Sequence, residues 1–292
     1  MPLGVGPISE YPTTLGSLLK NSMKDKKPKT FKKTHSDRDR ARHKKQEEFT
    51  LYGWNACVSA FKNRPESLLR LFFSRSRAPD LKAVKAWCAE KKIPFRQLDK
   101  ESLNKVASGT HHEGIVMVVR PRPCDSVHRL VRGSIPENGM VVALDGIENP
   151  HNQGAILRSC AYFGVRGLII PSTGTVTGIT SSAARMAEGG WETVPVYNSS
   201  DLSSSLRDCR EQGWCVVGAD PNAKESLSSA KITFPAVLVL GNEQEGLSDR
   251  VKRRCDTLVH IPGKGEVQSL NVSVAAGILL AELDRRSSKG KK

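Results

Sequence analysis

The stretch that decides the fold is MVVALDGIENPHNQGAILR, residues 140–158. Residues 140–144 are apolar without alternation, which predicts a strand buried on both faces of a parallel sheet. A polar loop follows at 145–154, and a helix that carries Arg158 comes next. Because a strand, a loop and a helix in this order begin a β-α-β unit, the sequence predicts an α/β fold.

The same alternation continues towards the C-terminus. Ligands gather at the carboxyl ends of the strands in an open parallel sheet, so the loops that follow strands are the candidate binding segments. The three most unusual loops are 145–154, 241–248 and 262–271. Further strands are expected at 167–170, 193–196, 215–219, 236–240 and 257–261, and a long, mostly apolar helix at 270–286.

The N-terminal part of the chain predicts a second, smaller α/β domain with a largely parallel sheet. Its expected helices are 53–61, 81–91 and 100–107, and its expected strands are 68–73, 94–98 and 114–119. The predicted organisation is a disordered basic arm at 1–48, the small domain at 49–120, a linker at 121–137, the large domain at 138–286 and a basic tail at 287–292.

The net charge of +15 is concentrated at the two ends of the chain. Such basic arms bind polyanions through counterion release, which favours nucleic acid over the alternative of a solubilising tail. No apolar run is long enough to span a membrane, and no secretory signal is recognisable, so we expect a cytoplasmic protein without a membrane partner.

The seven cysteines form no CxxC pair, and neither a disulfide framework nor a metal site is expected. Buried thiols are the simpler interpretation, with a single nucleophilic cysteine as the alternative. The pair His111 and His112 lacks the HExxH spacing of a zinc protease. Neither GxGxxG after a strand nor GxxxxGK[ST] occurs, which argues against a dinucleotide oxidoreductase and a P-loop NTPase.

Polar residues in the three loops suit a ligand with ribose hydroxyls and a phosphate or carboxylate group. Arg158, one to two turns after Asn152, carries a guanidinium that can bind phosphate; a helix cap at Asn152 and a solvated Arg158 are the alternative. Glu243 follows a strand end and can accept from ribose hydroxyls, unless the loop is only a surface turn. Ser269 and Asn271 stand just before or at the start of the long helix, where both can bind a ligand. The alternative is that Ser269 caps the helix.

Taken in order, the three loops resemble the motifs of the SpoU (TrmH-like) RNA ribose methyltransferases, within the SPOUT superfamily. The first motif is NPHNQG at 149–154 with Arg158, the second runs from LGNE to GLS at 240–248, and the third from IP to SLNVSVA at 261–275. The similarity covers about residues 138–285. Close relatives often have methionine and fewer charges where this chain has GKG at 263–265, a departure that questions the substrate more than the activity.

Residues 51–120 resemble the RNA substrate-binding domain that often precedes this catalytic domain. It usually opens with Tyr-Gly, here Tyr52-Gly53, and closes with His-Gln-Gly, here His112-Glu113-Gly114. Glu113 in place of glutamine is a departure from the family pattern.

The resemblance implies a parallel α/β sheet with a C-terminal trefoil knot, a homodimer and the cofactor S-adenosylmethionine. The implied reaction is methylation of a ribose 2′-hydroxyl in RNA, with ribosomal RNA and guanosine favoured and transfer RNA as the alternative. The implied catalytic residues are Arg158, Asn152, Glu243, Ser269 and Asn271. The implied cofactor-binding residues are Leu240, Gly241, Asn242, Gly246, Ile261, Pro262 and Leu270.

In the family, the arginine at the position of Arg158 acts as a base or binds the neighbouring phosphate. Guanidinium groups stay protonated near neutral pH, so we favour Arg158 as an electrostatic anchor. No metal is required for direct methyl transfer. A non-catalytic RNA-binding or ribosome-assembly factor on the same fold is the alternative from a different class.

Overall fold

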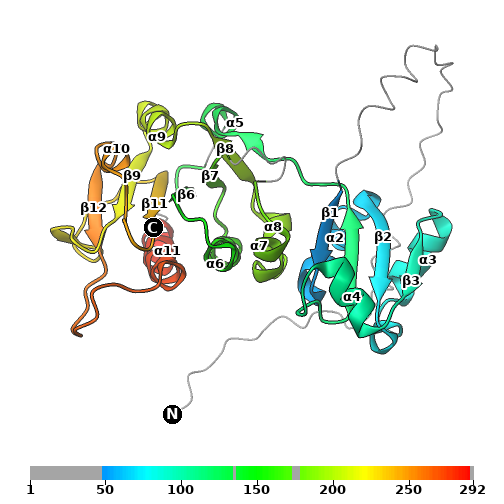
Figure 1. The fold of residues 1–292 in the computed structure, drawn as a ribbon. Helices are drawn as coiled ribbons and strands as arrows, with labels where there is room; N and C mark the ends of the chain where they lie inside the picture. Colours follow the sequence, from blue (N-terminus) through cyan, green and yellow to red (C-terminus); the bar gives the residue numbers. More distant parts are fainter. Residues whose placement is uncertain (1–47, 134–135, 173–177, 290–292) are drawn as a thin grey trace, which may run out of the picture.

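The computed structural model describes residues 48–133, 136–172 and 178–289 (Figure 1). The predicted N-terminal basic arm therefore lies outside the described residues apart from Glu48, as do the last three residues of the predicted basic tail. The described chain forms two sheets, one of four strands and one of eight, each with helices against it.

The eight-stranded sheet contains only parallel neighbours, in the order β10-β12-β9-β11-β6-β7-β8-β5. Strands β6 and β11 pair over their whole length, from Ala236 opposite Met140 to Gly241 opposite Asp145. The predicted parallel α/β fold is confirmed. The strands are β5 (Asp125–Ser126), β6 (Met140–Asp145), β7 (Leu168–Pro171), β8 (Val196–Ser199), β9 (Cys215–Ala219), β10 (Glu225–Ser226), β11 (Ala236–Gly241) and β12 (Thr257–His260).

Helices cover both faces of this sheet. Alternate residues of β6 point to opposite sides, so Val142 and Leu144 pack with α6, α7 and α11, whereas Val141 and Ala143 pack with α5, α9 and α10. Both faces of the sheet are thus covered by helices and shielded from water, which explains why the strands are apolar without alternation. The helices are α5 (Val127–Arg132), α6 (Pro150–Tyr162), α7 (Ser181–Met186), α8 (Gly190–Thr193), α9 (Leu202–Glu211), α10 (Asp249–Lys252) and α11 (Val272–Lys289).

The smaller sheet differs from its prediction, because it is mainly antiparallel. Its order is β1-β4-β2-β3, and only β2 and β3 run parallel. The unpredicted strand β1 pairs with β4, and β4 occupies the centre with all five residues buried. The elements are β1 (Phe49–Tyr52), α2 (Trp54–Asn63), η3 (Pro65–Ser67), β2 (Leu68–Phe73), η4 (Arg75–Arg77), α3 (Lys82–Glu90), β3 (Phe95–Gln97), α4 (Lys100–Ala107) and β4 (Ile115–Val119).

The segment 121–137, expected as a linker, contributes to the large sheet. Strand β5 adds to its edge beside β8, and α5 buries Val127 and Leu130 against it. The connection itself is fixed where the Arg122 guanidinium donates to the carbonyl oxygens of Trp191 and Val194. The proline-rich stretch therefore passes closely over the larger domain.

The C-terminal helix α11 begins two residues later than expected and continues to Lys289. Arg285 and Arg286 lie on this helix, and each pairs with Glu282. The Arg286 guanidinium also donates to the carbonyl oxygens of Leu227 and Ala230, which anchors the helix. No helix among the described residues is both long and apolar enough to cross a membrane.

Candidate active site

The loop after β6 ends in a tightly capped helix start. The Asn149 side chain accepts from the His151 backbone N–H at 2.9 Å, and Pro150 occupies the first helical position. The cap of α6 is therefore Asn149, and the alternative of Asn152 as the cap is wrong. Asn152 lies within the first turn, where its side chain is available for other contacts.

The loop after β11 is held by its own backbone and by the Asn242 side chain. The backbones of Asn242 and Gly246 exchange two hydrogen bonds of 3.0 Å. The Asn242 amide donates to the Gly146 carbonyl at 2.8 Å and accepts from the Gln244 N–H at 2.8 Å. These contacts tie the loop to the neighbouring β6 loop and leave Glu243 at its tip.

Gly241 is required by this geometry. A Cβ at that position would lie 2.3 Å from the carbonyl carbon of Gly246 and 2.4 Å from the nitrogen of Leu247. Both are backbone atoms, which cannot rotate away. The end of β11 therefore accepts only glycine without displacement of the loop.

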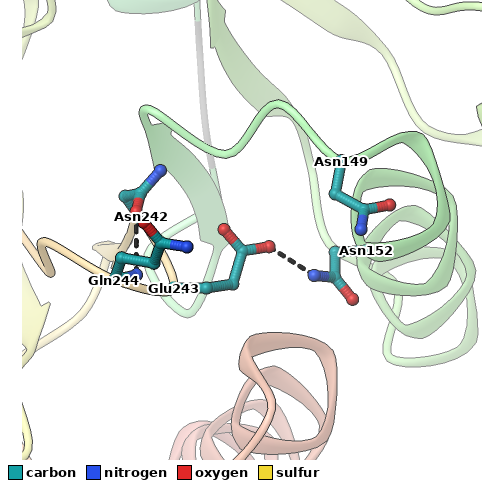
Figure 2. Close-up of a pocket in the computed structure, with 5 residues that line it drawn as sticks. All are labelled: Asn149, Asn152, Asn242, Glu243 and Gln244. Carbon is teal, nitrogen blue, oxygen red and sulfur yellow. Dashed lines mark hydrogen bonds between the residues drawn. The ribbon is translucent and has the colours of Figure 1, made fainter.

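Three predicted site residues meet through their side chains. The Asn152 amide nitrogen donates to the Glu243 carboxylate (Figure 2), and the Asn271 amide donates to the Asn152 oxygen at 3.1 Å. These residues come from the start of α6, the β11 loop and the residue before α11. The carboxyl ends of β6 and β11 lie side by side, which explains why Asn152 meets Glu243, 91 residues away in the chain. Asn271, 119 residues from Asn152, comes close because α11 packs on α6.

A polar cavity of about 350 Å³ opens beside this chain of hydrogen bonds. Its lining offers amide donors and acceptors and one carboxylate. Asn149 and Gln244 were not among the predicted residues, although the Asn-Pro pair at a helix start is a recognisable signal for the former. The lining residues are Asn149, Asn152, Asn242, Glu243 and Gln244 (Figure 2).

Of the remaining predicted residues, only Asn242 lines the cavity. Arg158 is exposed on α6, and within the described residues its side chain makes no hydrogen bond or ion pair. Ser269 is exposed and does not cap α11; instead, Asn271 accepts from the Ser273 N–H at 2.9 Å. Leu240 and Gly241 are buried, Ile261 is half-buried, and Pro262, Leu270 and most of the third loop are exposed. Asn242 and Gly246 form the backbone bridge of the second loop.

Six of the seven thiols are poor nucleophiles. Burial raises the pKa of Cys88 and Cys124 to about 11, and that of Cys160, Cys209 and Cys255 to about 12. Burial raises the pKa of Cys57 as well. A raised pKa keeps a thiol protonated near neutral pH, which disfavours the alternative of a nucleophilic cysteine.

Comparison with known proteins identifies the family. Residues 139–281 match the SpoU rRNA Methylase family, and residues 50–123 match the family described as RNA 2′-O ribose methyltransferase substrate binding. The chain is 34% identical to Escherichia coli O157:H7 YfiF, named an uncharacterized tRNA/rRNA methyltransferase, over 87% of this chain and 73% of YfiF. It is 32% identical to 23S rRNA (guanosine-2′-O-)-methyltransferase RlmB of Nitrosomonas europaea, over 82% of this chain and 92% of RlmB.

Solved structures share the fold. A protein from Porphyromonas gingivalis assigned to the TrmH family of RNA methyltransferases aligns with a TM-score of 0.63 at 26% identity, over 85% of this chain and 93% of the other. An rRNA methyltransferase from Sinorhizobium meliloti has the same fold, with a TM-score of 0.69 at 23% identity over 87% of this chain and 91% of its own. The chain therefore belongs to the SpoU rRNA methylase family, and the prediction of an RNA methyltransferase is confirmed.

Proposed function

We propose that this protein transfers a methyl group from S-adenosylmethionine to the ribose 2′-hydroxyl of a guanosine in ribosomal RNA. The observation that carries the proposal is the hydrogen-bonded set of Asn152, Glu243 and Asn271 at the carboxyl ends of two central strands. Relatives named 23S rRNA guanosine-2′-O-methyltransferases support the choice of RNA and nucleotide. With this substrate, we expect the protein in the cytoplasm.

The cavity suits part of a nucleoside cofactor in size and chemistry. Its volume of about 350 Å³ lies within the range of roughly 300–1,000 Å³ common for small-molecule sites. Amide and carboxylate groups in the lining match ribose hydroxyls and the polar ends of an amino acid. We assign one side of the cofactor site to Leu240, Gly241, Asn242 and Gly246, and the other to Ile261, Pro262 and Leu270.

When bound, the cofactor supplies an electrophilic methyl group on a sulfonium. The chain's own residues then position the ribose. Glu243, oriented by the Asn152 amide, accepts a hydrogen bond from a ribose hydroxyl, and Asn271 keeps Asn152 in place. Such positioning alone can lower a barrier by several kcal/mol.

Arg158 and Ser269 act on the RNA in this proposal. The Arg158 guanidinium binds a phosphate next to the target ribose, because it is exposed and carries a fork of donors that matches a phosphate. As a permanent cation it stabilises negative charge that develops on the 2′-oxygen, while the proton leaves to phosphate or water. Ser269 donates to the ribose.

We also propose a homodimer. Leu270, Val274 and Ile278 are between 40% and 52% exposed and follow one another at four-residue spacing from the end of the third loop along one side of α11. A row of exposed apolar side chains beside a candidate site supports burial against a second copy of the chain. The trefoil knot remains a prediction from the family.

Transfer of a labelled methyl group from S-adenosylmethionine to purified RNA tests the function. Ribosomal and transfer RNA from cells that lack the gene serve as separate substrates. A methylated 2′-oxygen cannot attack the adjacent phosphate, so the label should stay in alkali-resistant dinucleotides that contain guanosine. Label in transfer RNA alone would show that the substrate is transfer RNA. Tight RNA binding without any label would support a non-catalytic factor.

A further inference from the structure

Two sequence motifs of the small domain have no role in the chemistry above. Tyr52-Gly53 stands at the start of α2, and His112-Glu113-Gly114 forms the turn before β4. The structure brings both motifs together around one side chain of the large domain, Arg185 on α7. In Figure 1, α7 and α8 lie next to the small domain.

Arg185 is bound by both motifs. Its Nε donates to the His111 carbonyl at 2.6 Å, and its Nη2 donates to the Glu113 carboxylate at 3.1 Å. Its aliphatic stem rests on Gly53, where a Cβ would lie 3.1 Å from the Arg185 Cγ. Gly53 has a φ of 91°, so a larger residue there is disfavoured both by the backbone and by this contact.

Glu113 joins three elements. Its second carboxylate oxygen accepts from the Trp54 N–H at 3.0 Å, which caps α2 in the absence of a capping side chain at Gly53. Its carbonyl oxygen accepts from the Arg77 Nε at 3.0 Å. Glu113 holds a left-handed φ of 53°, a conformation that costs about 1 kcal/mol outside glycine and persists because these contacts fix it.

A second set of contacts holds the far end of α2. The Arg64 guanidinium binds Glu192 through two hydrogen bonds of 2.8 and 2.9 Å, and the Glu192 side chain is only 3% exposed. At the start of α2, close to the contacts of Glu113, Asn55 donates to Glu188 at 2.6 Å. Helix α2 is therefore fixed at both ends to the segment that contains α7 and α8.

This segment packs directly on the helix that carries the candidate site. A Cβ on Gly154 of α6 would lie 2.5 Å from the Ala183 carbonyl oxygen and from the Met186 Cβ. Met186 follows Arg185, and Gly154 lies two residues after Asn152. The backbones of α6 and α7 thus touch between the domain contact and the site.

We propose that Arg185 and Glu113 are positioning residues that lock the RNA-binding domain onto α7, so that RNA held by the small domain presents its ribose to Asn152 and Glu243. The effect on how RNA is presented rests on the proposed function, whereas the contact between Arg185 and Glu113 does not. The two motifs then recognise the catalytic domain, and not RNA. A glutamine at position 113 has a single carbonyl oxygen, so it can keep only one of the two acceptor contacts, with Arg185 or with the Trp54 N–H.

Steady-state methyl transfer with variants of the full chain tests this proposal. Arg185→Ala and Glu113→Ala should each raise the KM for RNA about three- to tenfold, as expected for the loss of one or two charge-assisted hydrogen bonds, with S-adenosylmethionine affinity unchanged. The increase in KM in the double variant should be smaller than the product of the two single effects, because both substitutions remove the shared Arg185–Glu113 contact. Glu113→Gln should give a KM for RNA between those of the wild type and Glu113→Ala, because its single carbonyl oxygen can keep one of the two acceptor contacts.

Arg207→Ala is the matched control, since it removes an arginine that pairs with Asp208 on the opposite layer of the large domain. It should leave the KM for RNA unchanged. If Arg185→Ala does not fold, Arg185→Lys, which keeps the stem and loses the fork, should give an intermediate KM. The proposal would be overturned if the two increases in KM multiply in full in the double variant. It would also be overturned if the KM for RNA stays within twofold of the wild type in both alanine variants.

Hydrogen exchange provides a readout that needs no activity. Glu113→Ala should accelerate exchange at the start of α2, and Arg185→Ala should accelerate exchange both there and in α7. If the wild-type protein transfers no methyl group to any RNA, the proposed function fails while this exchange pattern still tests the contact. Unchanged exchange in both variants would overturn the contact itself.

Discussion

Replacement of Gly241 by alanine tests the second loop as a cofactor-binding element. The added Cβ would meet Gly246 and Leu247 backbone atoms at 2.3–2.5 Å, whereas ordinary contacts begin near 3.4 Å. The loop must therefore move by about 1 Å away from β11. That displacement breaks the two hydrogen bonds between Asn242 and Gly246.

The expected loss follows from those two bonds. Each backbone hydrogen bond contributes about 0.5–1.5 kcal/mol net. Without the two bonds, restoring the wild-type loop conformation when the cofactor binds costs about 1–3 kcal/mol of binding free energy. This corresponds to an increase of roughly 5- to 150-fold in the dissociation constant of S-adenosylmethionine. The strands lie deeper in the core than this loop and should stay in place, so the circular dichroism spectrum of Gly241→Ala should match that of the wild type.

Calorimetric titration of S-adenosylmethionine measures this effect. Gly277→Ala on α11 is the control, because nothing lies within 4 Å of the new Cβ. It should bind the cofactor normally and gain up to about 1 kcal/mol of stability from a better helix former. A folded Gly241→Ala protein with wild-type affinity would refute the assignment of this loop to the cofactor.

Three further predictions concern the site, the domain contact and pH. Arg158→Ala should abolish methyl transfer and leave S-adenosylmethionine affinity intact, as activity and titration together will show. Arg64→Ala leaves the buried Glu192 carboxylate without its cation, so denaturant unfolding should show a loss of about 3–5 kcal/mol; a loss below 1 kcal/mol would contradict this. Burial lowers the pKa of His112, whose Nδ1 accepts from the Gly114 N–H. As the pH falls, His112 therefore takes up a proton in the unfolded chain before it does so in the folded protein. The free energy of unfolding should decrease below about pH 6.5, by at most about 1.4 kcal/mol per pH unit. His112→Gln should flatten this slope in denaturant unfolding measured at several pH values.

The sequence predicted the large domain better than the small one. Strands such as Cys215–Ala219 stand out because a parallel sheet covered on both faces selects unbroken apolar runs. Strand pairing in the small domain depends on β1, four residues next to the charged N-terminal segment, and on β4 inserting between β1 and β2. No local pattern encodes such a long-range pairing, so the antiparallel arrangement was missed.

The site was predictable to the extent that its residues follow strand ends. Asn152 and Glu243 meet because β6 and β11 are neighbours in the sheet, and Asn271 joins them because α11 packs on α6. The cap at Asn149 was missed because Asn149 and Asn152 both stand near the start of the helix and only the geometry selects one. The contact between Arg185 and Glu113 joins two domains and leaves no periodic signal in either segment.

The most direct test of the proposed function is a map of ribose 2′-O-methylation across total RNA from cells without the gene, complemented with the wild-type protein or with Arg158→Ala. We predict that one guanosine of the large-subunit ribosomal RNA loses its methyl group in the deletion and regains it only with the wild-type protein. Identical maps in all three strains would contradict the account.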